Sequence, residues 1–383
     1  MSVCKPSEEY LNQLRKRYRK ATKKQRGRIL DELVETTGYH RKHAIALLRG
    51  KRQHRNPRVP IRHPRQRIYT DEDKRTVLWL ADLFDEIGSK RLRAAMNVEL
   101  ETLYQRQHLQ VCRACFKRLQ HISPATMDRL RHAERRAPGH RRGGTKPGTL
   151  LKSQISVRTF ADWDDKRPGF EEIDLVQHDG GNSSGFFACT LNVTDVCLGW
   201  TEMRAVVTKA QKYVFSELEQ IRANLPFPLL GLDSDNGAEF INDQLIRYCD
   251  AEKITFTRGR TGHKNDNPYV EQKNWSVVRR LVGYARYDTS RQVNQLNALY
   301  AVARLYLNHF VPVQKLVSKE RQGHKTRKVF DAYQTPYQRV LDSPLVNEKA
   351  KRKLRAIHAT LDIVVLKRQM DDLLDALIPS KQW

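Results

Sequence analysis

The sequence predicts an α/β core that is preceded by all-α segments and followed by C-terminal helices. Up to about residue 136, apolar residues recur at helical spacing between polar ones. From about residue 155 the pattern changes to short β-rich runs, and then to alternating helices and strands. This order favours a mixed sheet covered by helices.

The charge of the chain is large and uneven. The 383 residues carry a formal net charge of +27, which predicts an acidic polymer as partner. Residues 1–156 hold 37 Lys and Arg against 15 Asp and Glu, a net of +22, which suggests a basic binding module joined to a nearly balanced remainder. The six cysteines lack a regular pattern and no signal or membrane segment stands out. We therefore expect a cytoplasmic, nucleoid-associated bacterial protein.

Residues 1–50 are predicted to form a helix-turn-helix DNA-binding domain. Two helices come first, of which the second ends at Gly38, and a short basic helix follows and ends at Gly50. The alternative is a three-helix bundle with a solvated basic face. The residues offered to DNA would be His40, Arg41, Lys42 and Arg49.

Residues 51–70 are predicted to form a basic, Pro-rich arm. The segment holds seven Lys and Arg, three Pro and no acid, so helix is excluded and charge repulsion keeps the chain extended. Such an arm suits the minor groove or phosphates, whereas a passive linker needs no such charge. The arginines expected to contact DNA are Arg55, Arg58, Arg62 and Arg65.

Residues 71–136 are predicted to form a second helix-turn-helix domain. Thr70 would cap its first helix, and Ser123 with Pro124 would begin its last. A basic hinge is expected over 137–155. Arginines near the reading face of this domain are Arg129, Arg131, Arg135 and Arg136.

Residues 156–310 are predicted to form the α/β core, and 311–383 a C-terminal DNA-binding or assembly region. Three strands come first, over FEEIDLVQHDGG, FFACTLNVTDV and GWTEMRAV. Helices and strands then alternate through KAQKYVFSELEQIRAN, LLGLDSD, FINDQLIRYCDAE, ITFTRG and PYVEQKNWSVVRRLVGYA. Long helices near 290–309 and 346–377 complete the chain, and the apolar stripe of LDIVVLKRQMDDLLDALI would support assembly or pack on the protomer's own core.

Three carboxylates are placed so that they can converge in this core. Asp174 interrupts an apolar strand, where an unpaired charge is costly. Asp235 ends a second strand 60 residues later, and Glu271 lies one helical turn into PYVEQKNW after a further 35 residues. Two strands and a helix of one domain could thus hold a pair of hard cations for phosphodiester chemistry.

This spacing, with the runs DSDNGAEF and KNDNPYVEQ, resembles the DDE transposases of bacterial insertion sequences and the retroviral integrases. The likeness covers about residues 155–310, and TKPGTLLKSQISVRTF and FDAYQTPYQRVL also look like the bacterial group. The resemblance implies a ribonuclease-H-like core with Asp174, Asp235 and Glu271 as catalytic residues and ligands of two Mg²⁺ ions, which Mn²⁺ can replace. It also implies cleavage of double-stranded DNA by water, attack of the freed 3′-hydroxyl on target DNA, and a homo-oligomer assembled on paired transposon ends.

Several neighbouring residues need a separate interpretation. The family motif Ser-Asp-x-Gly maps onto residues 234–237, so Asp235 is the expected ligand and Asp233, on the same strand face, a neighbour that tunes the site. Asp179 falls in a turn and Asp195 at a strand end, where acids are ordinary. His178 shares a face with Asp174 and would contact DNA or a metal-bound water, or simply be packed.

Further DNA contacts are expected around the helix of Glu271. Related transposases carry a Lys seven residues after the Glu, where this chain has Val278 followed by two arginines. A zinc site from His40, His43, Cys112 and Cys115 is disfavoured, because the helix-turn-helix already explains the histidines. The residues expected to contact the transposon end are Arg258, Arg260, Lys264, Lys273 and Asn274.

The function predicted is therefore a DNA transposase that binds terminal inverted repeats and catalyses Mg²⁺-dependent strand cleavage and transfer. A first alternative is a sequence-specific DNA-binding repressor with a non-catalytic transposase core. A second is a ribonuclease-H-type nuclease or resolvase, which would cleave without end specificity.

Overall fold

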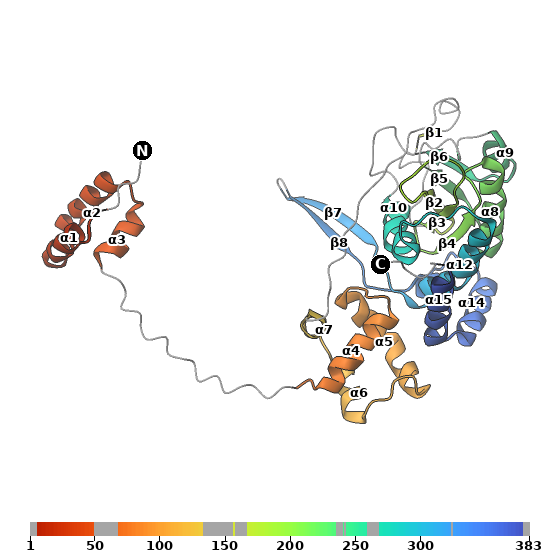
Figure 1. Ribbon diagram of the computed structural model, residues 1–383, viewed down its shortest axis with the longest axis horizontal. Coiled ribbons are helices and arrows are strands. Elements are labelled where there is room, and N and C mark those ends of the chain that lie inside the picture. The colour runs from red at the N-terminus through yellow and green to blue at the C-terminus, as the bar shows by residue number, and fades with distance from the viewer. Residues whose placement is uncertain are drawn as a thin grey trace. The chain divides into compact units, whose positions relative to one another are not determined.

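The computed structural model describes residues 6–49, 68–132, 156–157, 167–234, 240, 243–258, 268–322 and 325–377. The chain divides into two compact units, Met1–Ile68 and Tyr69–Trp383 (Figure 1). Each unit has its own hydrophobic core, so each is described by itself.

In the first unit, residues 6–49 form three helices around a small apolar core. Ser7 accepts the Tyr10 amide at the first N-terminus, and Gly38, at φ +70°, ends the second helix with its amide on Val34 O. Leu14, Leu33 and Leu48 are buried between the helices. The helices are α1 (Glu8–Lys20), α2 (Lys23–Thr37) and α3 (Arg41–Leu48).

The second unit begins with four helices that share a core with later elements. Buried apolar residues of these helices belong to one cluster with Tyr300, Leu366 and Met370, which come from the C-terminal half of the chain. Residues 69–132 are thus part of the same compact unit as the sheet. The helices are α4 (Asp71–Leu83), α5 (Ser89–Gln105), α6 (Arg113–Gln120) and α7 (Pro124–Arg131).

A mixed six-stranded sheet forms the centre of the second unit, in the order β1-β6-β5-β2-β3-β4. Strand β3 is antiparallel to both of its neighbours, whereas β2, β5, β6 and β1 run parallel to one another. This sheet confirms the predicted ribonuclease-H-like α/β core. The strands are β1 (Ser156–Val157), β2 (Phe170–Gln177), β3 (Cys189–Asp195), β4 (Thr201–Val206), β5 (Gly231–Ser234) and β6 (Thr255–Arg258).

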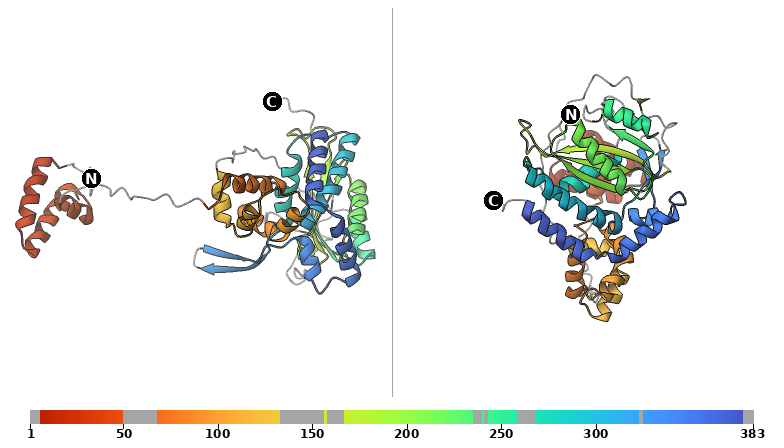
Figure 2. Two further views of the ribbon diagram at one scale, coloured as in Figure 1. Left: turned by 90° about the horizontal axis from the view of Figure 1, so that it is seen from below. Right: turned by 90° about the vertical axis from the view of Figure 1, so that its right-hand side faces the viewer.

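Helices cover both faces of the sheet (Figure 2). On one face, Ile173 and Leu232 pack with residues of α8 (Gln211–Asn224) and α9 (Asp243–Ala251). On the other, Val176 packs in one cluster with residues of the segment that follows β6. That segment consists of α10 (Pro268–Lys273), the π-helix η2 (Asn274–Arg279), α11 (Arg280–Val282) and α12 (Ser290–Phe310).

The described part of the C-terminal region forms an antiparallel hairpin and three helices. The predicted helical stretch 346–377 is two helices, because Asp362 accepts the amides of Val364 and Val365 and so begins a new helix. No described helix has both the length and the apolarity needed to cross a membrane. The elements are β7 (Leu316–Gln322), β8 (Lys325–Phe330), α13 (Pro336–Asp342), α14 (Glu348–Thr360) and α15 (Ile363–Leu377).

Candidate active site at the acidic face of the sheet

Two acids of β2 point to the same face of the sheet. Alternation along the strand places Ile173 and Leu175 in the apolar cluster with α8 and α9, so Glu172 and Asp174 lie on the opposite face. Glu172 is fully buried, whereas Asp174 is half-buried. The sheet therefore offers Asp174 as the more accessible carboxylate of this pair.

Glu172 fixes the start of the helix that carries Glu271. Its Oε2 accepts the backbone amide of Val270 at 3.0 Å. The first amides of a helix have no partner within the helix, so a buried carboxylate both satisfies this donor and complements the helix dipole. Glu271 is the next residue in α10. The structure describes the backbone of Glu271 and not its side chain.

A second connection joins the same helical segment to Asp174. Asn274 Nδ2 donates to Asp174 Oδ2 at 2.5 Å, and Asn274 Oδ1 accepts from Asn192 Nδ2 at 2.7 Å. Asn192 is buried on β3, directly opposite Asp174 in the antiparallel register. The carboxylate of Asp174 is thus oriented by a chain of two amides.

The neighbouring strand β5 brings another acid to this face. Asp233 is opposite Glu172 in the parallel register, is fully buried, and accepts the Thr257 hydroxyl through Oδ1 at 2.5 Å. The register ends with Ile173 opposite Ser234. The following residue, Asp235, lies outside the described residues, so its predicted place in the site stays a prediction.

Among the described residues of this face, the Asp174 carboxylate has donor chemistry that suits an oxygen-coordinated divalent cation. A half-buried, hydrogen-bonded carboxylate such as Asp174 is a ligand that Mg²⁺ prefers. Glu172 and Asp233 are buried and accept hydrogen bonds from the protein, which suits supporting residues rather than ligands. Within the described part of the chain, no group of three His, Cys, Asp or Glu side chains is placed to hold a metal ion.

Other predicted residues near the site are structural in the described fold. His178 is buried, and its Nε2 lies 2.7 Å from Thr190 Oγ1, which lies 2.6 Å from Tyr300 OH. Burial lowers the pKa of His178 to about 3, with Arg279 adding to the effect, so the packed interpretation of this histidine holds. Asp179 accepts the Gly181 amide in a turn, as predicted from its context.

Asp195 is also structural. It ends β3, is buried, and accepts the Gly169 amide through Oδ2 at 2.8 Å. Burial raises the pKa of Asp195 to about 7 although its hydrogen bonds to backbone amides lower it. This carboxyl therefore closes a turn of the sheet and is remote from water.

The residues predicted to contact DNA differ in their exposure in the structure. Arg41 and Lys42 are exposed on α3, with Arg41 paired to Asp31, and Arg129 is exposed on α7. Arg258 is half-buried at the end of β6. The other predicted contacts lie outside the described residues: Arg55, Arg58, Arg62, Arg65, Arg260 and Lys264.

One of the expected contacts must be corrected. Arg131, assigned to a reading face, is 2% exposed, donates to Ile87 O at 2.8 Å and pairs with Glu86, because it closes the contact between α7 and the end of α4. Asn274 has both ends of its amide engaged by Asp174 and Asn192, and its predicted contact with DNA stays a prediction.

Lys273 stands in an unusual electrostatic position next to this network. It is half-buried, and burial lowers the pKa of its ammonium group to about 7, with the Arg91 guanidinium lowering it further. A cation held in this way gains from an incoming anion. The predicted contact of Lys273 with DNA stays a prediction.

Sequence reasoning missed Glu172 and Asn192 as members of the site. The signal that could have found Glu172 is its period-two spacing to Asp174, which places both side chains on one face of the strand. For Asn192 no sequence signal existed, because its role depends on the register between β2 and β3.

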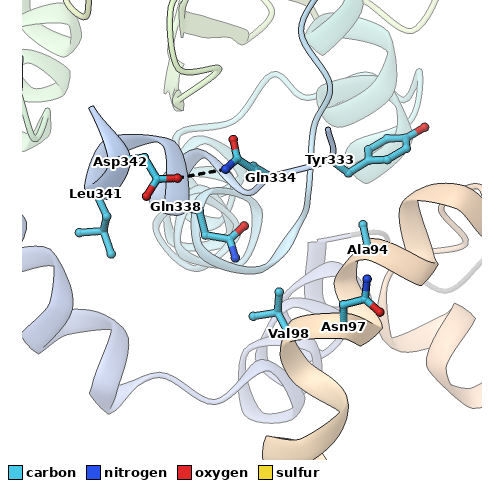
Figure 3. Close-up of a pocket in the computed structure, with 8 residues that line it drawn as sticks. All are labelled: Ala94, Asn97, Val98, Tyr333, Gln334, Gln338, Leu341 and Asp342. Carbon is cyan, nitrogen blue, oxygen red and sulfur yellow. Dashed lines mark hydrogen bonds between the residues drawn. The ribbon is translucent and has the colours of Figure 1, made fainter. Parts of the chain in front are cut away.

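A hollow of about 310 Å³ lies elsewhere, between α5 and the segment around α13 (Figure 3). Gln334 Nε2 donates to Asp342 Oδ2 at 3.0 Å at its rim. None of the sheet acids lines this hollow, so it is separate from the candidate site. Its lining residues are Ala94, Asn97, Val98, Tyr333, Gln334, Gln338, Leu341 and Asp342.

Comparison with known proteins identifies the family of this chain. The uncharacterized protein y4rM of Sinorhizobium fredii (strain NBRC 101917 / NGR234) is 38% identical over 323 residues, which cover 84% of this chain and 91% of that protein. The chain belongs to the y4rM family. No family model matches the sequence.

Solved structures similar to this y4rM-family chain include retroviral integrases. The catalytic core of BIV integrase is 18% identical at a TM-score of 0.28, covering 44% of this chain and 91% of that one. A simian T-cell lymphotropic virus intasome in complex with the PP2A regulatory subunit B56 gamma is 15% identical at a TM-score of 0.34, covering 65% of this chain and 76% of that one. The catalytic core of HTLV-2 integrase, in a dimeric form with magnesium, is 15% identical at a TM-score of 0.30, covering 39% of this chain and 93% of that one. The strand order of the sheet, and not these distant likenesses, defines the fold of the y4rM-family chain.

Proposed function

We propose that this protein is a DDE-type DNA transposase, which binds the inverted repeats at the ends of a mobile element and cleaves and joins DNA strands in a Mg²⁺-dependent reaction. The observation that carries the proposal is the hydrogen bond between Asn274 and Asp174. It ties the helical segment of Glu271 to the strand of the first predicted acid, as a shared site requires.

In this proposal Asp174, Asp235 and Glu271 hold the metal ions. Bound Mg²⁺ supplies activation of the attacking oxygen and stabilisation of the leaving oxygen of the phosphodiester. Asn274 keeps Asp174 Oδ2 in a fixed direction, and Glu172 holds the beginning of α10 through the Val270 amide. The excess of positive charge in residues 1–156 binds the DNA backbone, and two or more protomers assemble on paired ends.

The proposal is tested by strand transfer with oligonucleotides that carry the inverted repeats flanking the gene. Wild type is expected to join ends to a target in Mg²⁺ or Mn²⁺ and to stop when EDTA is added. Asp174→Asn, Asp235→Asn and Glu271→Gln are each expected to bind the ends and to lose joining. Gln272→Ala, an exposed change on the same helix, is the matched control and should stay active.

Two outcomes would replace the proposal. If wild type and Glu271→Gln both bind end DNA and neither joins it, the protein is a DNA-binding repressor with a non-catalytic core. If wild type cleaves DNA with no preference for the ends, it is a nuclease or resolvase.

A further inference from the structure

The β7–β8 hairpin is a surface that the site does not use. Figures 1 and 2 show its two strands extending away from the helices and sheet of the second unit. Val317 and Phe330, near its base, are 67% and 48% exposed. An isolated two-stranded ribbon is marginal in water, so a protein that keeps one has a use for it.

The hairpin is strongly basic. Residues 316–330 contain three Lys, two Arg and one acid, Glu320. The register places Lys319 directly opposite Lys328, a like-charge pair that destabilises a ribbon in water. An anion beside the ribbon would offset this repulsion, and a polyanion would do so along its whole length.

The base of the hairpin is held firmly on α13. Arg339, 9% exposed, donates through Nη1 to Asp331 Oδ2 at 2.6 Å and through Nη2 to Val313 O at 3.1 Å. Asp331 Oδ1 also accepts the Lys315 amide at 2.7 Å. Both ends of the ribbon are thus tied to one buried guanidinium, so the hairpin leaves the body in a set direction.

The dimensions of the hairpin suit one kind of polyanion. Strand β7 has seven residues and β8 has six, which gives a ribbon about 20 Å long with strands about 4.8 Å apart. The major groove of B-DNA, about 12 Å wide, admits a two-stranded β-ribbon. We propose that β7–β8 is a DNA-binding arm that places its basic residues along double-stranded DNA; this inference rests on the proposed action on DNA.

The test is equilibrium binding of the full chain to duplex DNA at several salt concentrations. The triple variant Lys319→Gln, Arg327→Gln, Lys328→Gln is compared with a control that has the same loss of charge on the exposed face of α14, Lys349→Gln, Arg352→Gln, Lys353→Gln. The hairpin variant is expected to bind about tenfold or more weakly, with the slope of log affinity against log salt reduced by about 2–3, while the control changes little. Circular dichroism melting checks that both variants remain folded.

The outcomes separate this inference from the proposed function. If both triple variants bind DNA equally weakly, net charge alone matters and the proposal that β7–β8 is a DNA-binding arm is overturned. An unchanged DNA affinity together with a change in oligomeric state, measured by light scattering without DNA, would assign the hairpin to contact with a second copy. Failure of wild type to bind any duplex would refute the proposed action on DNA itself.

Discussion

Asn274 Nδ2 lies 2.5 Å from Asp174 Oδ2, and this hydrogen bond joins the helical segment of Glu271 to the central strand of the sheet. The donor is an amide of the π-helix η2, whose other end is held by Asn192. Single π-helical turns within helices are frequent at functional sites. The orientation of Asp174 is therefore set by residues from two other elements.

Replacing Asn274 by Ala is expected to slow strand transfer by about 10²-fold at unchanged affinity for end DNA, because a small misplacement of a reacting group is costly. Single-turnover joining and equilibrium binding are measured side by side, with Gln272→Ala as control. A variant that joined strands normally but bound DNA weakly would show that Asn274 contacts DNA after all.

Replacing Glu172 by Ala is expected to lower the free energy of unfolding by about 1–3 kcal/mol, because the buried Val270 amide loses an acceptor. Glu172→Gln keeps an oxygen acceptor of similar reach and should lose less. Urea denaturation of the two variants measures the difference. Equal losses would assign the effect to the charge of Glu172 instead of its hydrogen bond.

The raised pKa of Glu99 predicts that the stability of the fold depends on pH. It is 6% exposed on α5, and burial raises its pKa from 4.5 to about 7 despite the lowering effect of Arg106. The folded state therefore binds this proton more tightly than the unfolded state, and the resulting stability is present below pH 4.5 and lost as the pH rises through 7.

The Glu99→Gln variant removes that titration. Relative to wild type it should gain about 1–3 kcal/mol in the free energy of unfolding at pH 8 and little at pH 4.5. Thermal or urea unfolding at the two pH values provides the comparison, with Glu101→Gln, an exposed acid of the same helix, as control. A pH-independent difference between Glu99→Gln and wild type would contradict the assignment.

Asp331→Ala separates the direction of the hairpin from its charge. The change removes one negative charge, which by itself strengthens DNA binding, but it also releases the Arg339 contact at the hairpin base. We expect weaker binding and a smaller salt slope if the set direction matters. Asp372→Ala, an exposed acid of α15, removes the same charge without this contact; if both variants bind more tightly, orientation of the hairpin is unimportant.

The sequence was sufficient for the elements whose apolar residues repeat at the spacing of a strand or helix. Alternation around Ile173 and Leu175 predicted β2, and capping residues such as Thr70 marked helix starts that the structure confirms. Asp174 was predicted because a charge in an apolar strand is conspicuous, and its side chain is described. Asp235 and Glu271 stay predictions, because their side chains lie outside the described part of the chain.

Contacts between distant segments were beyond local patterns. In the hairpin β7–β8, six of the 13 strand residues are charged and the apolar ones do not alternate with polar ones, so nothing in its sequence predicted strands. Arg131 was assigned to DNA because arginine is usually exposed; its burial depends on Glu86 and the Ile87 carbonyl, more than forty positions away in sequence. Such partners become visible only when the chain is folded.

The cluster that joins α4–α7 to α12 and α15 also limits how members of this family can diverge. A segment whose apolar side chains are shared with distant helices cannot be exchanged by recombination without leaving mismatched surfaces on both sides. Residues 69–132 must therefore be inherited together with the sheet, whereas the unit that ends at Ile68 has a core of its own and can be replaced as a cassette. Exchange of that first unit for another is therefore expected to leave the core of the second unit intact.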